Sequence, residues 1–390
     1  MNDKAVLMGH RAIKPRFPWV IHDDLKRALI ERGVRVVDFP SDRDPRAVAE
    51  IYRAQDIAFT FLMNYSAAGA CEEHPYPPVV GKVVSWQQDN PFHVANRIGK
   101  AHADQHWLCA DEEGLVYANA YYGNPASVAH FPHWATDLEL DPRAVEEKRF
   151  KDRSYDILFV GSVDLKQITM AERFIEDAPN QTRLFATALM EVALAKPVGP
   201  LTKHALKIRD GVGGEMAVND PVNFCRVQAA VDIIIRARRR IELLRALRGL
   251  RVTVISRSFR AFEEVLGDDL VKIGPGDFET GLRAMENAKV VLNTLPNYGG
   301  GVTERFFNAQ LRGAAVMSEA NGYLRRAFRE NENVLLYDPR TDLPDLAERL
   351  RAVLADQSTE DLASAGRQET RTNHLARHRV DKLLELHPLQ

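Results

Sequence analysis

Cysteine is scarce in this sequence, and its few cysteines show no pattern that would bind a metal or form a disulfide framework. Cys71, Cys109 and Cys225 are scattered through 390 residues and are odd in number. Such usage predicts a reducing, cytoplasmic compartment. The N-terminus runs directly into a strand pattern with no apolar segment of the signal-peptide kind. We therefore expect no signal peptide.

Long apolar runs and excess charge are missing as well. No apolar stretch is long enough to span a bilayer. The formal net charge of -2 argues against a nucleic-acid-binding protein or an anionic-membrane footprint, and the arginines at 236–240 form only a local cluster. The adjacent pairs Asp23-Asp24 and Asp268-Asp269 would point apart on a helix or turn. The sequence therefore favours a site without a metal.

The chain is long for a single hydrophobic core, which predicts two domains. Residues 1–150 and 151–360 each alternate strand and helix patterns, the second with a helical insertion at about 165–230. Residues 361–390 read as a C-terminal helix. This alternation predicts α/β domains with parallel sheets and ligands at the carboxyl ends of the strands. The expected strands are 5–9, 34–37, 56–62, 79–86, 106–110, 126–131, 155–161, 252–255, 271–276, 288–293, 314–318 and 334–338. Expected helices include 21–32, 45–53, 233–247, 303–313 and 361–386.

The most informative segment is 292–305, where a buried strand leads through a triple glycine into a helix. Gly299, Gly300 and Gly301 carry no Cβ, so their backbone N–H groups can approach a ligand closely. The positive end of the following helix favours phosphate. The alternative is a tight strand-to-helix turn without a ligand.

Three motifs, in this order and spacing, resemble the group 1 GT-B glycosyltransferases, and most closely their spore-maturation (CgeB-like) branch. They are the strand and glycine turn at 155–162, the run from Thr303 to Ser318 with its following turn and strand, and the helix start at 374–379. The likeness covers roughly residues 153–163 and 236–385. It implies a GT-B fold: two Rossmann-like domains facing a cleft, and a C-terminal helix packing back toward the first.

The resemblance also implies transfer of a sugar from a nucleotide-diphosphate sugar, held by the second domain without a metal or other cofactor. The residues expected to bind this donor are Gly161, Ser162, Arg257, Gly276, Phe278, Gly299, Gly300, Gly301, Val302, Thr303, Arg305 and Asn308. This list contains two arginines. Arg257 has an alternative interpretation as a solvated loop residue. Arg305 lies in the first turn of a helix, where its positive charge opposes the helix dipole unless an anion binds beside it.

One position departs from the family. Where many relatives hold the donor ribose with a glutamate, this chain has Asn308. Glu304 lies one helical turn earlier, on roughly the same face. Either Asn308 bonds one hydroxyl, or Glu304 has taken over the role. A carboxylate that merely complements the helix dipole is the other interpretation of Glu304.

Acceptor chemistry is expected in the first domain. Asp89 lies in a segment similar to the family's Trp-x-x-Asp-Asp-Pro motif, and a strand-end carboxylate could orient the acceptor or act as general base. A turn-capping role before Pro91 is the alternative. His10 is the other candidate base. His133 lies in a segment that is similar to a short motif at the end of the family's first domain, and a structural role is the alternative for both histidines. The tryptophans Trp19, Trp86 and Trp134 could stack on sugars or fill the core.

The sequence thus predicts a retaining glycosyltransferase, with a glycan, protein or small metabolite as acceptor. Two rivals share the fold: a nucleotide-sugar epimerase or phosphorylase, and a binding protein that has lost catalysis. The sugar, the base, the acceptor and the oligomeric state are not determined by the sequence.

Overall fold

The computed structural model describes residues 4–10, 17–40, 56–64, 82–93, 105–121, 126–137, 148–195, 201–212, 221–274 and 276–389. The chain divides into two compact units. Unit 1 comprises residues 1–138, 220–226 and 375–390, and unit 2 comprises 139–219 and 227–374. The helix expected at 45–53 lies outside the described residues.

Unit 1 is built on a six-stranded parallel sheet with the order β2-β1-β3-β4-β5-β6. Its strands are β1 (Ala5–His10), β2 (Arg35–Pro40), β3 (Ile57–Met63), β4 (Lys82–Gln87), β5 (Gln105–Cys109) and β6 (Ser127–His130). Residues two apart, such as Val6 and Met8 or Phe59 and Phe61, enter one core, because side chains alternate across a strand.

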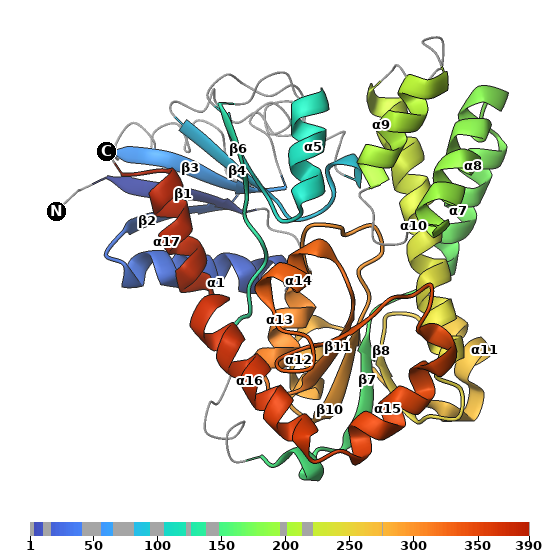
Figure 1. Ribbon diagram of the computed structural model, residues 1–390. Coiled ribbons are helices and arrows are strands. Elements are labelled where there is room, and N and C mark those ends of the chain that lie inside the picture. Colours follow the sequence, from blue (N-terminus) through green and yellow to red (C-terminus); the bar gives the residue numbers. More distant parts are fainter. Residues whose placement is uncertain are drawn as a thin grey trace. The chain divides into compact units, whose positions relative to one another are not determined.

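Two helices from opposite ends of the chain pack together in unit 1, α1 (Phe17–Glu31) and α17 (Ala376–Leu386). Leu25 and Leu29 of α1 share a core with Val380 and Leu383 of α17, at the spacing that places residues on one helix face. The expected return of the C-terminal helix to the first unit is thus confirmed (Figure 1). Within the described part of unit 1, the other elements are α5 (Glu112–Tyr121) and the 3-10 turn η1 (Pro91–His93).

Unit 2 contains the second six-stranded parallel sheet, with the order β12-β11-β10-β7-β8-β9. Its strands are β7 (Tyr155–Val160), β8 (Val252–Ile255), β9 (Leu270–Ile273), β10 (Ala288–Asn293), β11 (Ala315–Glu319) and β12 (Leu335–Tyr337). The central strands are almost continuously buried, as in sheets with helices on both faces. The predicted fold class, two parallel α/β sheets, is confirmed.

The helices of unit 2 include a group of four between β7 and β8, which Figure 1 shows gathered beside one another. These are α7 (Leu165–Glu176), α8 (Asn180–Ala195), α9 (Leu201–Val212) and α10 (Pro221–Ala246). The later helices are α11 (Arg260–Leu266), α12 (Phe278–Met285), α13 (Glu304–Leu311), α14 (Gly322–Ala327), α15 (Leu346–Ala355) and α16 (Ser358–Asn373). Short 3-10 turns are η2 (Phe150–Asp152), η4 (Gly267–Asp269) and η5 (Leu343–Asp345).

The predicted break between the insertion and a helix at 233–247 is wrong. One continuous helix, α10, runs from Pro221 to Ala246. Phe224, Val227, Val231 and Ile234 are all buried, so the helical spacing of the apolar residues continues through position 230. Proline at the first helical position, where its missing N–H costs nothing, fits this start.

The single helix predicted at 361–386 is also wrong, because α16 ends at Asn373 and α17 begins at Ala376. His374 lies in the break, with a φ of -133° that a helix does not allow. Its ring stacks on Phe307 at 4.8 Å and on Phe328 at 5.2 Å between centroids. Because these contacts are formed with residues distant in the sequence, the break between the two helices could not be predicted from a local pattern.

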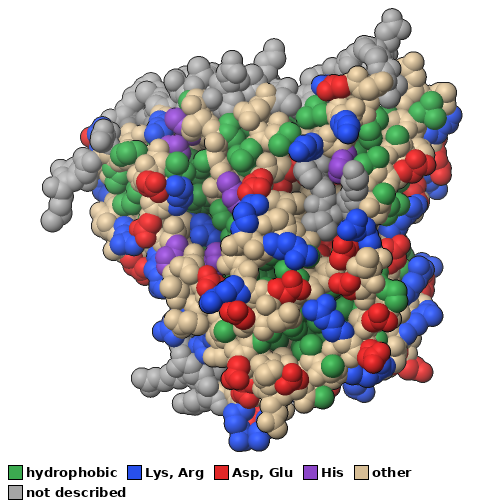
Figure 2. All heavy atoms as spheres, in the orientation of Figure 1, with side chains coloured by type: hydrophobic (Ala, Val, Ile, Leu, Met, Phe, Trp, Pro, Cys, Tyr) green, Lys and Arg blue, Asp and Glu red, His purple; other side chains and the backbone are tan. Residues whose placement is uncertain are grey.

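Among the described residues, no helix is both long and apolar enough to span a membrane. On the face drawn in Figure 2, basic and acidic side chains are interspersed. That mixture is consistent with the net charge of -2.

A buried carboxyl in unit 1 makes the stability of that unit depend on pH. Asp24 of α1 is completely buried, with Arg27 Nη2 at 3.2 Å from Oδ1. Burial, with a smaller contribution from the charge of Asp137, raises the pKa of Asp24 from 3.8 to about 7, against the opposing effects of Thr136 and Arg27. The folded carboxyl therefore holds its proton more tightly than the unfolded one. The contribution of the protonated Asp24 to the free energy of unfolding is therefore fully present below pH 3.8 and is lost as the pH rises through about 7.

We predict that Asp24→Asn becomes more stabilising, relative to the wild type, as the pH rises. Three pKa units correspond to about 4 kcal/mol in total, of which about 2 kcal/mol should develop between pH 5 and pH 8. Thermal or urea unfolding at both pH values measures the difference. Asp23→Asn, on the same helix with a half-exposed side chain, serves as control. Identical pH profiles for the two variants would contradict the role of Asp24.

Candidate functional site

The glycine-rich segment forms the predicted strand-loop-helix. β10 ends at Asn293, and α13 begins at Glu304 with Thr303 as its N-cap residue. The Thr303 side chain does not cap the helix, since its Oγ1 donates to Asn293 Oδ1 at 3.3 Å. Phe306 N donates to the Thr303 carbonyl oxygen at 3.1 Å, and no side chain of Thr303 caps the N–H groups of Glu304 and Arg305 at the start of the helix.

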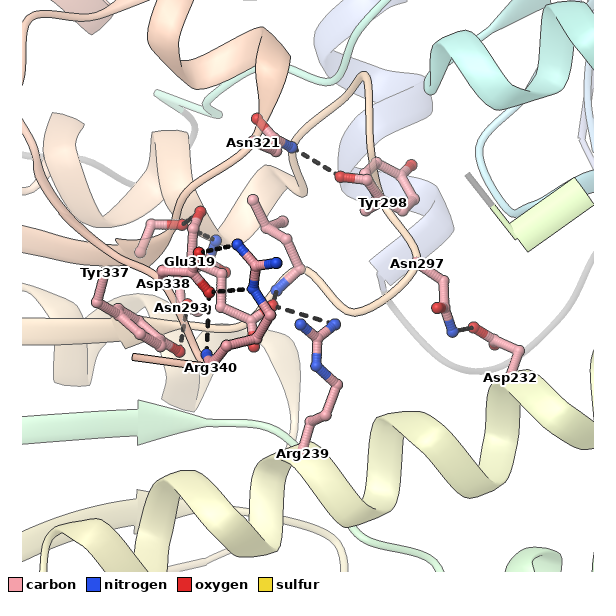
Figure 3. A network of polar contacts seen from close by, with 12 residues as sticks. Asp232, Arg239, Asn293, Asn297, Tyr298, Glu319, Asn321, Tyr337, Asp338 and Arg340 are labelled. Atoms are coloured by element: carbon pink, nitrogen blue, oxygen red, sulfur yellow. Dashed lines mark hydrogen bonds and ion pairs between the residues drawn. The ribbon is translucent and has the colours of Figure 1, made fainter. Parts of the chain in front are cut away.

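Asn321 holds the loop from its far side. Its Nδ2 group donates to the carbonyl oxygens of Tyr298 and Gly301, at 2.7 Å each. Its Oδ1 accepts from Leu324 N at 2.8 Å and so caps α14. One buried side chain thus fixes both ends of the glycine run to a helix start, and Figure 3 shows its bond to Tyr298.

Glu319, the last residue of β11, holds the start of the same loop. Its Oε2 accepts from Leu295 N at 2.6 Å, and Arg239 Nη1 of α10 lies 3.7 Å away. Both side chains are almost fully buried, and Figure 3 shows how they lie toward each other. Burial raises the pKa of Glu319, and the charge of Arg239 and the hydrogen bond from Leu295 oppose the rise. The pair therefore anchors the loop with a charge-assisted hydrogen bond.

Helix α10 contacts the middle of the loop. Asn297 has a φ of +59°, the left-handed conformation that asparagine tolerates better than most residues. Its Nδ2 donates to Asp232 Oδ1 at 2.8 Å, while Asp232 Oδ2 accepts from Arg236 Nε at 2.8 Å. The loop is thus held at several points along its length.

The turn after β7 lies against α10. Gly161 N donates to Ile255 O at 3.0 Å. A Cβ at Gly161 would lie 3.0 Å from the Phe159 ring and 3.8 Å from Arg240 Cζ, so this glycine permits a close approach. Arg240 Nη1 donates to the carbonyl oxygen of Ser162. The two donor-site residues predicted here therefore contact an arginine that the sequence did not single out.

The predicted base-reading segment approaches the end of β8 closely. A Cβ at Gly276 would lie only 2.4 Å from the carbonyl carbon of Ser256 and 2.6 Å from Arg257 N. Asp277 caps α12 by accepting from Thr280 N at 2.7 Å, which makes Phe278 the first residue of that helix. Only glycine allows this backbone contact at position 276.

Two buried arginines of this region, Arg240 and Arg305, lie near one another, and the charges of Asp232 and Glu319 offset that of Arg240 only in part. Arg240 Nε and Arg305 Nη1 are buried, and neither atom has a hydrogen-bond partner within the described structure. Burial lowers the pKa of Arg240, and the charges of Arg305 and Arg236 lower it further. Burial also lowers the pKa of Arg305, and Glu304 beside it acts in the opposite direction. Desolvated like charges close together destabilise the protein unless an anion joins them.

A cavity of about 370 Å³ opens beside Arg240, within unit 2. Its wall has an apolar part from α7 and α10 and a basic part from α10 and the turn after β8. The lining residues are Ser162, Val163, Asp164, Gln167, Ile168, Ile233, Arg236, Ala237, Arg240, Arg257 and Ser258. Its size is at the lower end of typical small-ligand sites.

Two other residues that were predicted to bind the donor are buried. Val302 is fully buried, and Asn308 is 1% exposed, with its Oδ1 accepting from Arg312 Nη1 at 3.3 Å. That Asn308 or Glu304 contacts the ribose of the donor remains a prediction. All the residues that were predicted to bind the donor lie in unit 2.

The candidate acceptor residues lie in unit 1. Asp89 is exposed two residues beyond β4, and its Oδ2 accepts from Asn64 Nδ2 at 2.9 Å. Asn64 Oδ1 in turn accepts from Gln88 N at 2.7 Å. This pair joins the carboxyl ends of β3 and β4 and leaves the carboxylate of Asp89 accessible. His10 is the last residue of β1, but its side chain lies outside the described structure.

Trp86 and Trp134 are core residues. They stack on each other at 4.7 Å between centroids, and His133 contacts Trp86 edge-on at 5.2 Å. All three are at most 4% exposed, which favours the structural interpretation over stacking on a sugar. The side chain of Trp19 is outside the described residues.

The sequence did not point to Asp232, Arg236, Arg240, Asn321 or Glu319. The sequence feature nearest to these residues was the arginine cluster at 236–240, which by itself indicates a local charge cluster and not a part of a site. Asp232, Arg236 and Arg240 are spaced four apart on α10, so a continuous helix would have placed them on one face. Across the described residues, no three His, Cys, Asp or Glu side chains gather as a metal site would require.

We predict that Gly276→Ala disrupts this site whereas Gly274→Ala does not. The new methyl at 276 would overlap the backbone of Ser256, and the forced shift should cost roughly 1–3 kcal/mol of stability. At 274 the nearest atom, in the Phe259 ring, is 3.9 Å away, an ordinary contact. Thermal unfolding of both variants tests the prediction. Equal stability of the two would contradict it.

Residues 236–385 match the family described as glycosyl transferase-like. The matched segment begins inside α10 and ends inside α17, so it contains Arg240, the glycine loop and α13. No curated protein matches the chain.

Several solved structures share the fold along the whole chain. Sucrose-phosphate synthase from Thermosynechococcus elongatus has a TM-score of 0.56 at 13% identity, covering 98% of each chain. A glycosyltransferase from Rickettsia africae has a TM-score of 0.54 at 11% identity, covering 99% of this chain and 98% of its own. HepE of Anabaena, in complex with UDP-glucose, has a TM-score of 0.52 at 12% identity, covering 98% of both.

At such identities these structures establish the fold alone. The family match covers the part of the chain that carries the glycine loop, in a chain with two six-stranded parallel sheets. The chain thus has the fold of the GT-B glycosyltransferases, and its residues 236–385 are similar in sequence to a glycosyl transferase-like family.

Proposed function

We propose that this enzyme transfers a sugar from a nucleotide-diphosphate sugar, and that the diphosphate binds between Arg240 and Arg305. The observation that carries the proposal is the charge in unit 2: two neighbouring guanidinium groups, each with a buried nitrogen that lacks a described partner. A diphosphate would accept hydrogen bonds from both and remove their repulsion.

The surrounding backbone supports the same ligand. The first-turn N–H groups of α13 and the positive end of its dipole favour an anion beside the glycine loop. Charge that develops on the leaving diphosphate during transfer would be stabilised by these fixed groups. We propose that they do this without a metal, since the charge needed is already present in the arginines.

The finer features of the reaction are proposals as well. HepE was solved with UDP-glucose, so UDP is the first nucleotide to test here. Asp89 in unit 1 is proposed to orient or deprotonate the acceptor hydroxyl, with His10 as the second candidate. Retention of the anomeric configuration, a cytoplasmic location and membership of the CgeB-like branch rest on the sequence motifs. The acceptor is a glycan, a protein or a small metabolite.

We predict that UDP, or one other nucleoside diphosphate, stabilises the protein against thermal unfolding to the same extent in Mg²⁺ and in EDTA. A ligand at a hundredfold excess over its dissociation constant adds about 2.7 kcal/mol. The panel is UDP, GDP, ADP, dTDP and CMP. A response to none of them would contradict nucleotide-sugar transfer, and a response only with Mg²⁺ would contradict the metal-free site.

Arg240→Gln and Arg305→Gln should each weaken binding of the responding diphosphate about 10- to 100-fold, because each removes a charged hydrogen-bond donor. Calorimetric titration measures the loss. Arg260→Gln is the matched control, since this arginine is 77% exposed on α11 and pairs only loosely with Glu264. Unchanged affinity in both test variants would place the diphosphate elsewhere.

Asp89→Asn should lower kcat by about 100-fold or more while leaving diphosphate affinity unchanged, if Asp89 assists proton transfer from the acceptor. Release of free nucleotide from the donor, with each candidate acceptor class, provides the assay. An unaltered kcat would exclude Asp89 from the reaction.

A further inference from the structure

Asp232 of α10 connects two parts of unit 2 that are distant in the sequence. Its side chain is 2% exposed, and each oxygen has a defined partner. Oδ1 accepts from Asn297 of the glycine loop, and Oδ2 accepts from Arg236, which lines the cavity. A buried carboxylate is costly unless its oxygens are bonded, so both contacts are enforced together.

The bond to Asn297 fixes the part of the loop that the other anchors leave out. Glu319 holds Leu295, and Asn321 holds the carbonyl oxygens of Tyr298 and Gly301. Asn297 lies between them in a left-handed conformation, which persists in a protein only when neighbouring contacts impose it. Figure 3 shows its side chain pointing at Asp232. The path of the backbone entering the three glycines therefore depends on α10.

The bond to Arg236 sets the position of a cavity cation. The Arg236 side chain is 38% exposed, so the Asp232 carboxylate is what keeps its guanidinium on a defined side of the cavity. Arg236 also lies near enough to Arg240 for its charge to lower the pKa of that arginine. One carboxylate thus orients the cation beside the proposed diphosphate site and partly offsets the accumulated positive charge.

Four charged residues of α10 face this region. Asp232, Arg236, Arg239 and Arg240 follow one another at offsets of four, seven and eight residues, the spacing of a single helix face. Asp232 contacts the glycine loop, and Arg236 lines the cavity. Arg239 pairs with Glu319, and Arg240 donates to the carbonyl oxygen of Ser162. Helix α10, the last helix of the inserted group, therefore forms part of the candidate site.

We infer that Asp232 is a positioning residue for the donor: it holds the glycine loop and Arg236 so that both meet the diphosphate. This inference rests on the proposed function, because it takes the bound anion to be a nucleoside diphosphate. It assigns to the α7–α10 insertion a share in donor recognition. Asp232 itself touches no substrate, since both its oxygens are engaged within the protein.

The experiment compares Asp232→Asn and Asp232→Ala with the wild type by calorimetric titration of UDP, or of the diphosphate that the panel selects, and of the matching nucleoside. Asp232→Ala should weaken diphosphate binding roughly 10- to 100-fold and nucleoside binding less than about threefold. Asp232→Asn keeps an oxygen for Asn297 but not the charge for Arg236, so its loss should be intermediate. With the nucleotide sugar, kcat should fall more than KM rises.

Glu242→Gln is the matched control, since it makes the same charge change on an exposed position of α10. It should leave both affinities unchanged. Equal losses for diphosphate and nucleoside would mean that Asp232 only supports the fold, and wild-type affinity in both Asp232 variants would overturn the inference. If Asp232→Ala does not fold, Asp232→Asn with Arg236→Gln gives the same comparison. Failure of the wild type to bind any diphosphate would instead refute the proposed function.

Discussion

The rest of unit 2 depends on how it accommodates an excess of buried positive charge. Arg240 and Arg305 come from helices far apart in the sequence; burial lowers the pKa of both, and the charge of Arg305 lowers that of Arg240 further. Such an arrangement persists when the remaining fold is stable enough to impose it. Arg240 bonds to the turn after β7, and Arg305 lies in the first turn of α13.

The glycine loop illustrates how that stability is supplied. It has no regular secondary structure, and its position is set by buried side chains from three elements: Glu319 at the end of β11, Asn321 before α14, and Asp232 on α10. Each of them bonds to the loop backbone or to a loop side chain. A loop held in this way is ordered before a ligand arrives, so less conformational entropy is lost on binding.

Much of the architecture could be predicted from the sequence because it follows from local patterns. Apolar strand residues, glycines at turns and N-cap residues such as Asp277 lie next to the elements they define. Strand order, by contrast, is not local, because it depends on the pairing of segments that are distant in the sequence. The continuity of α10 and the break at His374 were missed, because buried contacts with distant residues decided them.

The sequence by itself determined that two parallel α/β units would form and that the segment 292–305 would run from strand through glycines to helix. Periodicity and turn chemistry act over a few residues and suffice for this. Only the tertiary structure decided which charges share a site. Arg240 and Arg305 lie on different helices far apart in the sequence, and Asp89 becomes attached to Asn64 only through the pairing of β3 with β4. Such neighbours arise from long-range packing, which no short sequence pattern encodes.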